Sequence, residues 1–472
     1  LYISEIRVAK KAEIANNTPD VFAGNYTIND NKQTAFAGCT DLQCKVYEDG
    51  TELVISGDTF TTVAGKTYTV VYTAKDSGRA VYGSYSFVAH GLSEAGLLFD
   101  FASESGLGMY NGGSFNEIDP NLAWLESYKG ETGVVKFTNR NTDWDTAWFL
   151  SGIKPLFGKT YYDQCDYLVL RLYSSEKAWM NFEVEGDSAA DTKYIEFQTN
   201  GEGWADYYVP IAGFLGKWDM FGTPIHWSTH ARELYLSEIR AVKKAEITSQ
   251  ITGNQVLGSE ITLSDNAGTA IGENAVCTVL TPTQDEIAVT NGKFTPTEEG
   301  VYTVRYKAIS DTGIITQGSY TIAVKDGSLL YDFRTQAGLG GYRGDGCLEW
   351  LGTYDGRNDV VKFTNLGAEG EWCPAWLCRD ISPIFSKEYY QEFNFVEFEL
   401  YSTEACWFKL YAENVGDADV NSLVFQTNAE AGWHTYKISI KPLLEHWDDF
   451  TTQLMLSTHL REFYITSLRV TK

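Results

Sequence analysis

The feature that most constrains this chain is an internal repeat. The segment LYISEIRVAKKAEI at 1–14 returns as LYLSEIRAVKKAEI at 234–247, and its end returns again as FYITSLRV at 463–470. Shorter matched pieces lie between these segments: VKFTN at 135–139 and 361–365, FQTN at 197–200 and 425–428, and STHARE at 228–233 against STHLRE at 457–462. Self-similarity of this kind indicates successive copies of one structural unit. We therefore predict two copies, preceded at 1–10 by the last strand of a missing earlier copy.

Each copy divides into two unlike halves, because all 13 Trp fall in the second half of each copy. The Trp-free halves, 11–92 and 244–327, alternate β-branched or aromatic residues with polar ones, as in YTVVYTA at 68–74 and YTVRYKA at 302–308. The Trp-containing halves, 93–243 and 328–472, show the same alternation in YLVLRLY (167–173) and WMNFEV (179–184). Alternation with a period of two predicts short antiparallel strands, so the fold class is all-β.

Two family resemblances refine this prediction. FTPTEEGVYTVRYKAISDTG…GSYTIAV at 294–324 resembles the last strands of bacterial Ig-like domains, and GKTYTVVYTAKDSG…GSYSFVA at 65–89 fits the same pattern. The order LLFDF, YLVLRLY, W..Y.VPI and ELYLSEIRAV looks like that of β-jelly-roll carbohydrate-binding modules. Such domains occur together in multimodular surface proteins of Gram-positive gut bacteria. The resemblance implies two Ig-like β-sandwiches, 11–92 and 244–327, alternating with two β-jelly-roll sandwiches, 93–243 and 328–472.

The charge balance excludes several classes of partner. The chain has 37 basic and 63 acidic residues, a formal net charge of -26. This field repels phosphate backbones, so we expect no nucleic-acid binding. No apolar run reaches the roughly 18 residues of a membrane helix, so we expect no membrane insertion of this segment. The chain begins without Met or a visible signal peptide, and we interpret it as an excerpt of a longer protein.

Sorting strand residues by face suggests a first ligand site. Met180 and Phe182 are expected in the core, which leaves Trp179 and Asn181 on the opposite, polar face. A pyranose ring can stack its C–H face on an aromatic ring while amides and carboxylates bind its hydroxyls. The alternative is that these rings pack on a loop or on the neighbouring Ig-like domain. The predicted groups are Trp179, Tyr173, Asn181 and Gln198 in the first copy, and Trp407, Tyr401, Lys409 and Gln426 in the second.

A second candidate site is a polar loop with two Trp four residues apart. NTDWDTAW at 141–148 carries Trp144 and Trp148, and EGEWCPAW at 369–376 carries Trp372 and Trp376. Binding residues are common on loops of rigid β scaffolds. The alternative is that one Trp of each pair closes the end of the sandwich.

The sequence contains no motif that indicates a catalytic function. GxSxG, HExxH and a phosphate loop do not occur, and no carboxylate pair stands out. His230 with Arg232, matched by His459 with Arg461, is interpreted as a surface hydrogen-bonding pair. We therefore expect no enzyme.

Metal and disulfide assignments stay open at this level. The jelly-roll resemblance implies a structural calcium, for which Asp100 and Asp332 are the candidates, and the alternative is that both carboxylates end a strand in solvent. No CxxC motif occurs among the eight cysteines, and zinc is not expected. The disulfide state of Cys39/Cys44 and of Cys373/Cys378 is undecided.

Together these features predict a non-catalytic, extracellular binding protein, either cell-surface or secreted. The jelly-roll domains would bind glycans, such as dietary polysaccharide or host mucin glycans, and the Ig-like domains would act as spacers. One alternative is an adhesin that binds a host protein such as an immunoglobulin, and another is a purely structural stalk. Glycan binding predicts exposed rings in a groove, protein binding a flat exposed patch, and a stalk only buried Trp.

Overall fold

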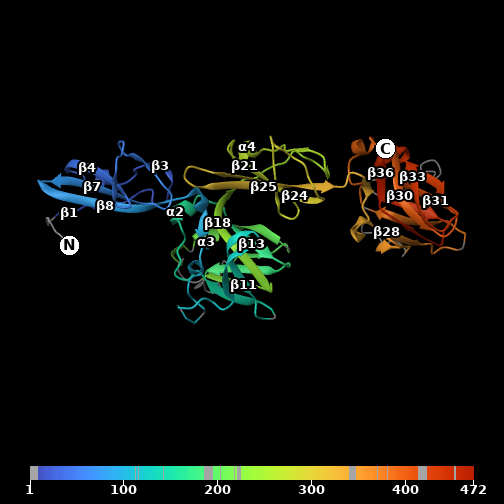
Figure 1. Cartoon of the computed structure of the whole chain (residues 1–472), viewed down its shortest axis with the longest axis horizontal. Helices are drawn as coiled ribbons and strands as arrows, with labels where there is room; N and C mark the ends of the chain where they lie inside the picture. Colours follow the sequence, from blue (N-terminus) through green and yellow to red (C-terminus); the bar gives the residue numbers. More distant parts are fainter. Residues whose placement is uncertain are drawn as a thin grey trace. The chain divides into compact units, whose positions relative to one another are not determined.

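The computed structural model describes residues 9–472 except 112, 115, 142, 185–194, 202, 217, 221–224, 340–346, 369, 380, 413–422 and 451–452. Among the described residues strands far outnumber helices, and several β-sheets form sandwich-like domains (Figure 1). This confirms the all-β prediction at the level of fold class. The chain divides into two compact units. The first holds the residues up to Thr248 with Asn266–Thr278 and Arg305–Tyr320, and the second holds Ser249–Asp265, Val279–Val304 and Thr321–Lys472.

The N-terminal part of the first unit is a small sandwich. Its main sheet has the order β1-β8-β7-β4-β5, with β2 beside β8, and β3 pairs with β6. In β7 the alternate residues Tyr68, Val70 and Tyr72 are buried, as the period of two predicts. The elements are β1 (Lys10–Lys11), β2 (Val21–Phe22), β3 (Gly24–Thr27), α1 (Lys32–Ala35), β4 (Thr40–Glu48), β5 (Thr51–Leu53), β6 (Thr59–Thr62), β7 (Thr67–Asp76), β8 (Arg79–His90) and η1 (Leu92–Glu94).

The next part, from β9 to β18, is called the first sandwich. Strands β10, β11, β18, β13 and β16 form one sheet, with β9 beside β18, and the second sheet has the order β12-β17-β14-β15. The elements are β9 (Leu97–Phe99), η2 (Glu104–Leu107), β10 (Leu122–Tyr128), β11 (Glu131–Thr138), β12 (Asp145–Phe149), α2 (Lys159–Tyr162), β13 (Tyr167–Ser174), β14 (Trp179–Val184), β15 (Ile195–Gln198), β16 (Gly203–Pro210), α3 (Ala212–Leu215), η3 (Trp218–Met220), β17 (Ile225–Thr229) and β18 (Glu233–Lys244).

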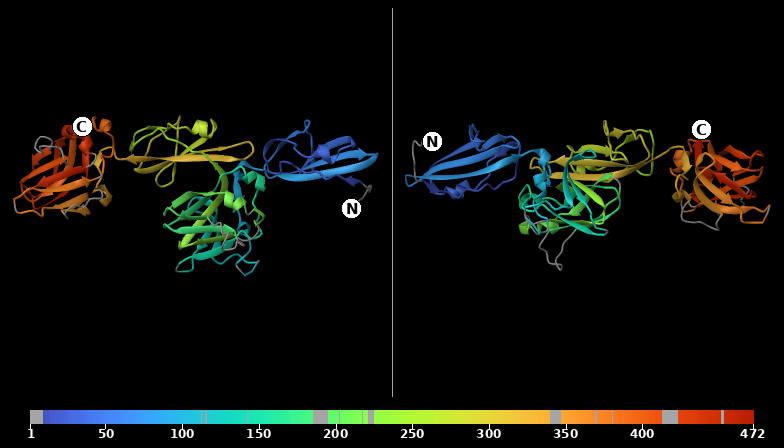
Figure 2. Two further views of the ribbon diagram at one scale, coloured as in Figure 1. Left: turned by 180° about the vertical axis from the view of Figure 1, so that it is seen from behind. Right: turned by 60° about the horizontal axis from the view of Figure 1, so that its bottom comes forward.

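The second sandwich, from β26 to β36, repeats this arrangement, and its strands can be followed in both views of Figure 2. One sheet has the order β26-β36-β30-β35-β28-β27 with β33 beside β30, and the other has the order β29-β34-β31-β32. The elements are β26 (Leu329–Tyr331), η4 (Gln336–Leu339), β27 (Leu348–Tyr354), β28 (Arg357–Thr364), β29 (Cys373–Arg379), α5 (Lys387–Tyr390), β30 (Phe395–Ser402), β31 (Trp407–Ala412), β32 (Leu423–Gln426), β33 (Gly432–Ser439), α6 (Lys441–Glu445), α7 (Trp447–Phe450), β34 (Gln453–Thr458), β35 (Glu462–Ile465) and β36 (Leu468–Thr471).

The residues between the two sandwiches are shared by the two units. Within the first unit, Lys243 of β18 lies beside Thr316 of β25, and within the second unit, Gln255 of β19 lies beside Val324 of β25. The domain boundaries expected from the repeat stay predictions. The elements are β19 (Gln255–Val256), β20 (Ile261–Thr262), α4 (Ala267–Ala270), β21 (Val276–Leu280), β22 (Glu286–Ile287), β23 (Lys293–Phe294), β24 (Gly300–Ile309) and β25 (Ile315–Lys325).

The cores of the sandwiches lie between their two sheets. In β13 the alternate Leu168, Leu170 and Leu172 are fully buried, and in β14 Met180 and Phe182 are fully buried as well. The corresponding residues of the second sandwich, Val396, Phe398, Leu400, Phe408 and Leu410, are buried in the same way. The predicted core faces are therefore confirmed, and the opposite faces of these strands point away from the core.

One pair of core positions exchanges large and small side chains between the copies. In the first sandwich Trp227 stacks on Phe137 with ring centroids 6.0 Å apart, and the position at the start of β18 is Leu234. In the second sandwich Leu456 takes the place of Trp227, and Phe463 stacks on Phe363 at 4.7 Å. The combined side-chain volume of the two positions is roughly conserved, because the second sandwich has a smaller residue at one position and a larger residue at the other. Close-packed cores tolerate such volume-conserving exchanges.

Candidate functional site

In each sandwich the four-stranded sheet carries an exposed Trp on its outer face. Trp179 begins β14 and is 44% exposed, because the inward Met180 turns its neighbours to the other side. Across the ladder Trp179 lies opposite the exposed Gln198 of β15. In the second sandwich Trp407, 49% exposed, lies opposite Gln426 of β32. The structure thus brings together a ring and an amide that were predicted to share a site.

The loop Trp144 joins the same surface through a His that sequence reasoning did not assign to the site. The ring of Trp144 packs on the ring of His230 with centroids 4.1 Å apart, and His230 Nδ1 lies 2.8 Å from Asp143 Oδ1. His230 is also hydrogen-bonded to Trp179, because the backbone N–H of His230 donates to Trp179 O at 3.4 Å. Thr229 Oγ1 donates to the same carbonyl at 2.8 Å. The predicted strand and loop sites are therefore parts of one surface.

The second sandwich repeats this arrangement. Trp372 is 37% exposed and packs on His459 with centroids 4.2 Å apart. His459 Nδ1 hydrogen-bonds Gly370 O at 2.7 Å, and Thr458 Oγ1 donates to Trp407 O at 2.9 Å. The matched STH segments before the last strand were the sequence signal for these His, but their distance from the Trp loops along the chain concealed the contact.

Polar side chains occupy the row of Asn181 on the four-stranded sheet of the first sandwich. Thr146 of β12 lies beside Ser228 of β17, which lies beside the half-buried Asn181 of β14. Thr146 Oγ1 and Ser228 Oγ are hydrogen-bonded at 2.7 Å. We call this surface the first tryptophan face, made of Trp144, Thr146, Trp179, Asn181, Gln198, Ser228 and His230.

The second tryptophan face, made of Trp372, Pro374, Trp407, Lys409, Gln426 and His459, has the same outline with a different charge. Lys409 replaces Asn181, and its Nζ lies 4.8 Å from the centre of the Trp372 ring. A cation over an aromatic face is favourable. The two faces thus share their rings but present different polar groups to a ligand.

The other loop Trp of the first copy has different neighbours. Trp148 is half-buried and meets Tyr110 edge to face at 6.4 Å, while its backbone N–H donates to Asp119 Oδ2 at 3.1 Å. The side chain of Trp376 lies outside the described residues, although its backbone pairs with Met455 in β34.

Tyr173 and Tyr401 do not lie on the tryptophan faces, which corrects the predicted grouping. Tyr173 belongs to β13 and Trp179 to β14, and these consecutive strands lie in different sheets. Tyr173 is only 9% exposed and is enclosed by Tyr128, Trp204 and Tyr235.

These rings form an aromatic cluster on the outer face of the larger sheet. Tyr128 and Tyr235 stack with centroids 3.8 Å apart, and Lys129 Nζ lies 4.2 Å from the centre of the Tyr173 ring. Burial, followed by the nearby Glu233 carboxylate, raises the pKa of Tyr235. The second sandwich repeats the cluster with Tyr354, Tyr401, Trp433 and Tyr464. Mutual burial makes the cluster a small core of its own.

The predicted calcium residues have other partners. Asp332 accepts hydrogen bonds from Arg334 Nε at 2.8 Å and from Arg334 N at 3.0 Å. Asp100 accepts one from Ala102 N at 2.9 Å, a turn interaction. Within the described ranges no group of three or more His, Cys, Asp or Glu side chains could hold a metal ion. The calcium site stays a prediction, and these contacts give it no support.

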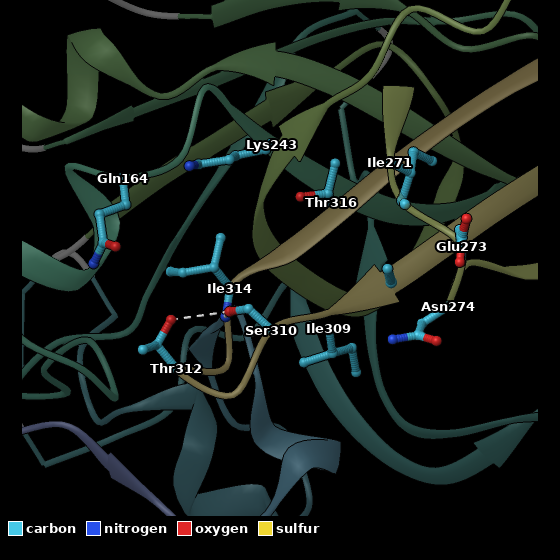
Figure 3. A pocket seen from close by; sticks show the side chains of 12 residues that line it. Gln164, Lys243, Ile271, Glu273, Asn274, Ile309, Ser310, Thr312, Ile314 and Thr316 are labelled. Atoms are coloured by element: carbon cyan, nitrogen blue, oxygen red, sulfur yellow. Dashed lines mark hydrogen bonds between the residues drawn. The ribbon is translucent and has the colours of Figure 1, made fainter. Parts of the chain in front are cut away.

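Two hollows in the first unit lack the features of a sugar site. The hollow in Figure 3, of about 400 Å³, is lined by polar and aliphatic residues such as Gln164, Lys243 and Ile314, and Ser310 Oγ lies 2.9 Å from Thr312 Oγ1. None of its lining residues is aromatic. A larger hollow of about 600 Å³ includes Tyr26 and Tyr161, but both rings are buried. The tryptophan faces are therefore the better candidates.

No protein family and no curated protein matches the sequence. Among solved structures, the chain is similar to the M60 catalytic domain with two CBM51 domains of Clostridium perfringens ZmpB, at 9% identity and a TM-score of 0.17 over 100% of this chain and 55% of that one. It thus spans about half the length of that neighbour.

Two further solved structures are similar to this chain at comparable levels. One is Bacteroides ovatus SGBP-B in complex with a mixed-linkage heptasaccharide, at 10% identity and a TM-score of 0.13 over 99% of this chain and 98% of that one. The other is chicken CNTN1 FN1–FN3, at 8% identity and a TM-score of 0.12 over 67% and 99%. None of the helices in the described ranges has the length and apolarity needed to cross a bilayer.

Proposed function

We propose that the chain is a non-catalytic, extracellular glycan-binding protein whose binding sites are the two tryptophan faces. In this proposal both sandwiches are β-jelly-roll modules, and the Trp-free segments are Ig-like spacers. The observation that carries the proposal is the recurrence, in both copies, of an exposed Trp directly across the ladder from a Gln.

The chemistry of these residues suits a sugar. An exposed Trp ring on a sheet face is in contact with water, which is unfavourable for its apolar surface. A pyranose ring can cover this surface with its flat C–H side. The amide of Gln198 or Gln426 can donate to one hydroxyl and accept from another. The His230 and His459 rings, each packed on a Trp, add a second aromatic edge at the end of the same row.

The repetition supports a polymeric ligand. Two weak sites on one chain bind a repeating polysaccharide with an affinity above that of either site, because the second event is intramolecular. The different polar residues, Asn181 in one face and Lys409 in the other, allow the two sites to prefer different positions along a glycan.

The exposed rings disfavour the structural-stalk alternative, which predicts buried Trp side chains. Trp179, Trp372 and Trp407 are all more than one third exposed. Binding of a host protein remains the competing function, since exposed aromatics serve protein recognition as well.

The test is binding of the intact chain to an array of plant polysaccharides and mucin glycans, beside the Trp179→Ala/Trp407→Ala variant. The control is Tyr82→Ala, which removes a ring of similar exposure (44%) in β8, a strand that contributes to neither face. We expect a hit that the control keeps and that the double variant loses by about tenfold or more. A hit that survives in the double variant, or no hit on any glycan, would overturn the proposal, and the latter result would favour a protein ligand.

A further inference from the structure

Two cysteines of the second sandwich come close together. The sulfur atoms of Cys347 and Cys373 are 3.9 Å apart. Cys347 directly precedes β27 and is only 2% exposed, whereas Cys373 begins β29 and is half-buried. Strands β27 and β29 belong to different sheets, so a bond between these residues would join the two layers of the sandwich.

The backbone holds both residues in place. Cys347 O accepts a hydrogen bond from Thr364 N at 2.7 Å, and Cys373 lies opposite Thr458 in the β29–β34 ladder. A disulfide needs sulfur atoms about 2.05 Å apart, and a change of side-chain rotamer covers the difference where the backbone positions are compatible.

The first sandwich has a hydrogen bond close to the same two positions. The matched segments NLAW and CLEW align Asn121 with Cys347, and DTAW and CPAW align Asp145 with Cys373. Asn121 Nδ2 donates to Thr146 O, next to Asp145, at 3.1 Å. In the first sandwich a hydrogen bond therefore joins the starts of β10 and β12. In the second sandwich two thiols lie close together at the starts of β27 and β29.

The local pair Cys373/Cys378 does not fit a disulfide. Both residues lie in β29, where five residues of extended strand span about 16 Å. The Cα atoms of a disulfide lie within about 7 Å of each other, so this pairing would break the strand.

We propose that Cys347 and Cys373 form a disulfide under oxidising conditions. The thiolate of Cys373, the more exposed residue, attacks a low-molecular-weight disulfide such as oxidised glutathione, forms a mixed disulfide and releases one small thiolate. The Cys347 thiolate then attacks Cys373 Sγ and releases the second small thiolate. The protein loses two electrons and two thiol protons, and the oxidant gains both as two small thiols.

This bond would act on the second tryptophan face, which is the part of the inference that rests on the proposed function. Cys373 directly follows Trp372, so the disulfide fixes the end of the loop that carries this ring. A loop held in its bound conformation loses less entropy when a ligand binds.

The experiment is disulfide mapping of the intact chain, which does not depend on glycan binding. The protein is treated with oxidised glutathione, free thiols are alkylated, and a digest is examined by mass spectrometry. We expect a peptide pair cross-linked through Cys347 and Cys373. The midpoint of one thermal unfolding transition should fall by roughly 5–10 °C on reduction.

The control is the Cys347→Asn/Cys373→Asp variant, which carries the residues of the first sandwich and whose unfolding should not respond to the reductant. Alkylation of both Cys347 and Cys373 after oxidation, or a cross-link from either one to another cysteine, would overturn the inference. Loss of glycan binding with the cross-link intact would count only against the proposed function.

Discussion

The rings of Trp144 and His230 are in contact, with centroids 4.1 Å apart and planes tilted by 51°, and Trp372 and His459 repeat the contact at 4.2 Å and 53°. The Trp comes from a loop before the first strand of the small sheet and the His from the end of a later strand. Their contact joins two groups of residues that lie far apart in sequence into one candidate binding surface. The same contact in both copies indicates that the arrangement belongs to the repeat rather than to one copy.

The first prediction concerns these His rings. His230→Ala/His459→Ala should weaken glycan binding about fivefold, because each change removes a ring contact worth about 1 kcal/mol that positions the neighbouring Trp. Titration calorimetry with a glycan found on the array measures the effect. His434→Ala, a His in the larger sheet of the second sandwich, should leave affinity unchanged. Equal affinity for the double variant and the wild type would separate the His from the site.

The second prediction uses Tyr173, which sequence reasoning grouped with Trp179. Tyr173→Ala should leave glycan affinity unchanged, because its strand lies in the other sheet. It should lower the free energy of unfolding by about 3 kcal/mol, since a buried ring leaves the cluster with Tyr128 and Tyr235. Chemical denaturation and calorimetry give both values, and a loss of affinity without a loss of stability would return Tyr173 to the site.

Alternation along a strand predicts which face is buried but not which sheet the strand joins. The period of two assigned the faces of β13 and β14 correctly, since Leu170 and Met180 are both buried. It could not tell that the two strands lie in different sheets, because the pattern says which face is buried and not which strand is the neighbour. The Trp179–Gln198 pair could be predicted because both residues point outward on successive strands, which here form a ladder.

The His contact needed the full fold. Trp144 and His230 meet only because β17 lies between β12 and β14, an order that no local signal specifies. The proximity of Cys347 and Cys373 depends in the same way on which sheet each strand joins.

The third prediction concerns the exchanged core positions. Trp227→Leu should destabilise the first sandwich by about 2–3 kcal/mol by leaving a void beside Phe137. Adding Leu234→Phe, which copies Leu456 and Phe463 of the second sandwich, should recover about 1 kcal/mol. A double-mutant cycle in urea measures this coupling. Strict additivity of the two changes would show that the positions do not share one volume.

The fourth prediction is a pH dependence of the second unit. Arg334 hydrogen-bonds Glu299 and Asp332. The hydrogen bond from Arg334 lowers the pKa of Glu299. Burial alone would raise the pKa of Asp332, but its hydrogen bonds with Arg334 outweigh burial and lower it.

Proton linkage determines the direction in which stability changes with pH. Carboxylates with a lowered pKa in the folded state bind fewer protons than in the unfolded state, so their stabilisation is present above the unfolded pKa of about 4. It is lost as the pH falls through the lower folded values. Calorimetry from pH 3 to 7 should therefore show the second unit losing stability below about pH 4. Arg334→Met should reduce this dependence, and Arg461→Met, which removes an Arg that donates to Gly367 O, should not. Identical pH profiles for wild type and Arg334→Met would contradict the assignment.

In the proposed function each sandwich binds one glycan through its tryptophan face. The most direct measurement is the stoichiometry of binding, by isothermal titration of the intact chain with a short oligosaccharide taken from the best array hit. We expect two sites per wild-type chain, one site in Trp179→Ala, one in Trp407→Ala and none in the double variant. Two sites in the double variant, with the fold intact by circular dichroism, would contradict it.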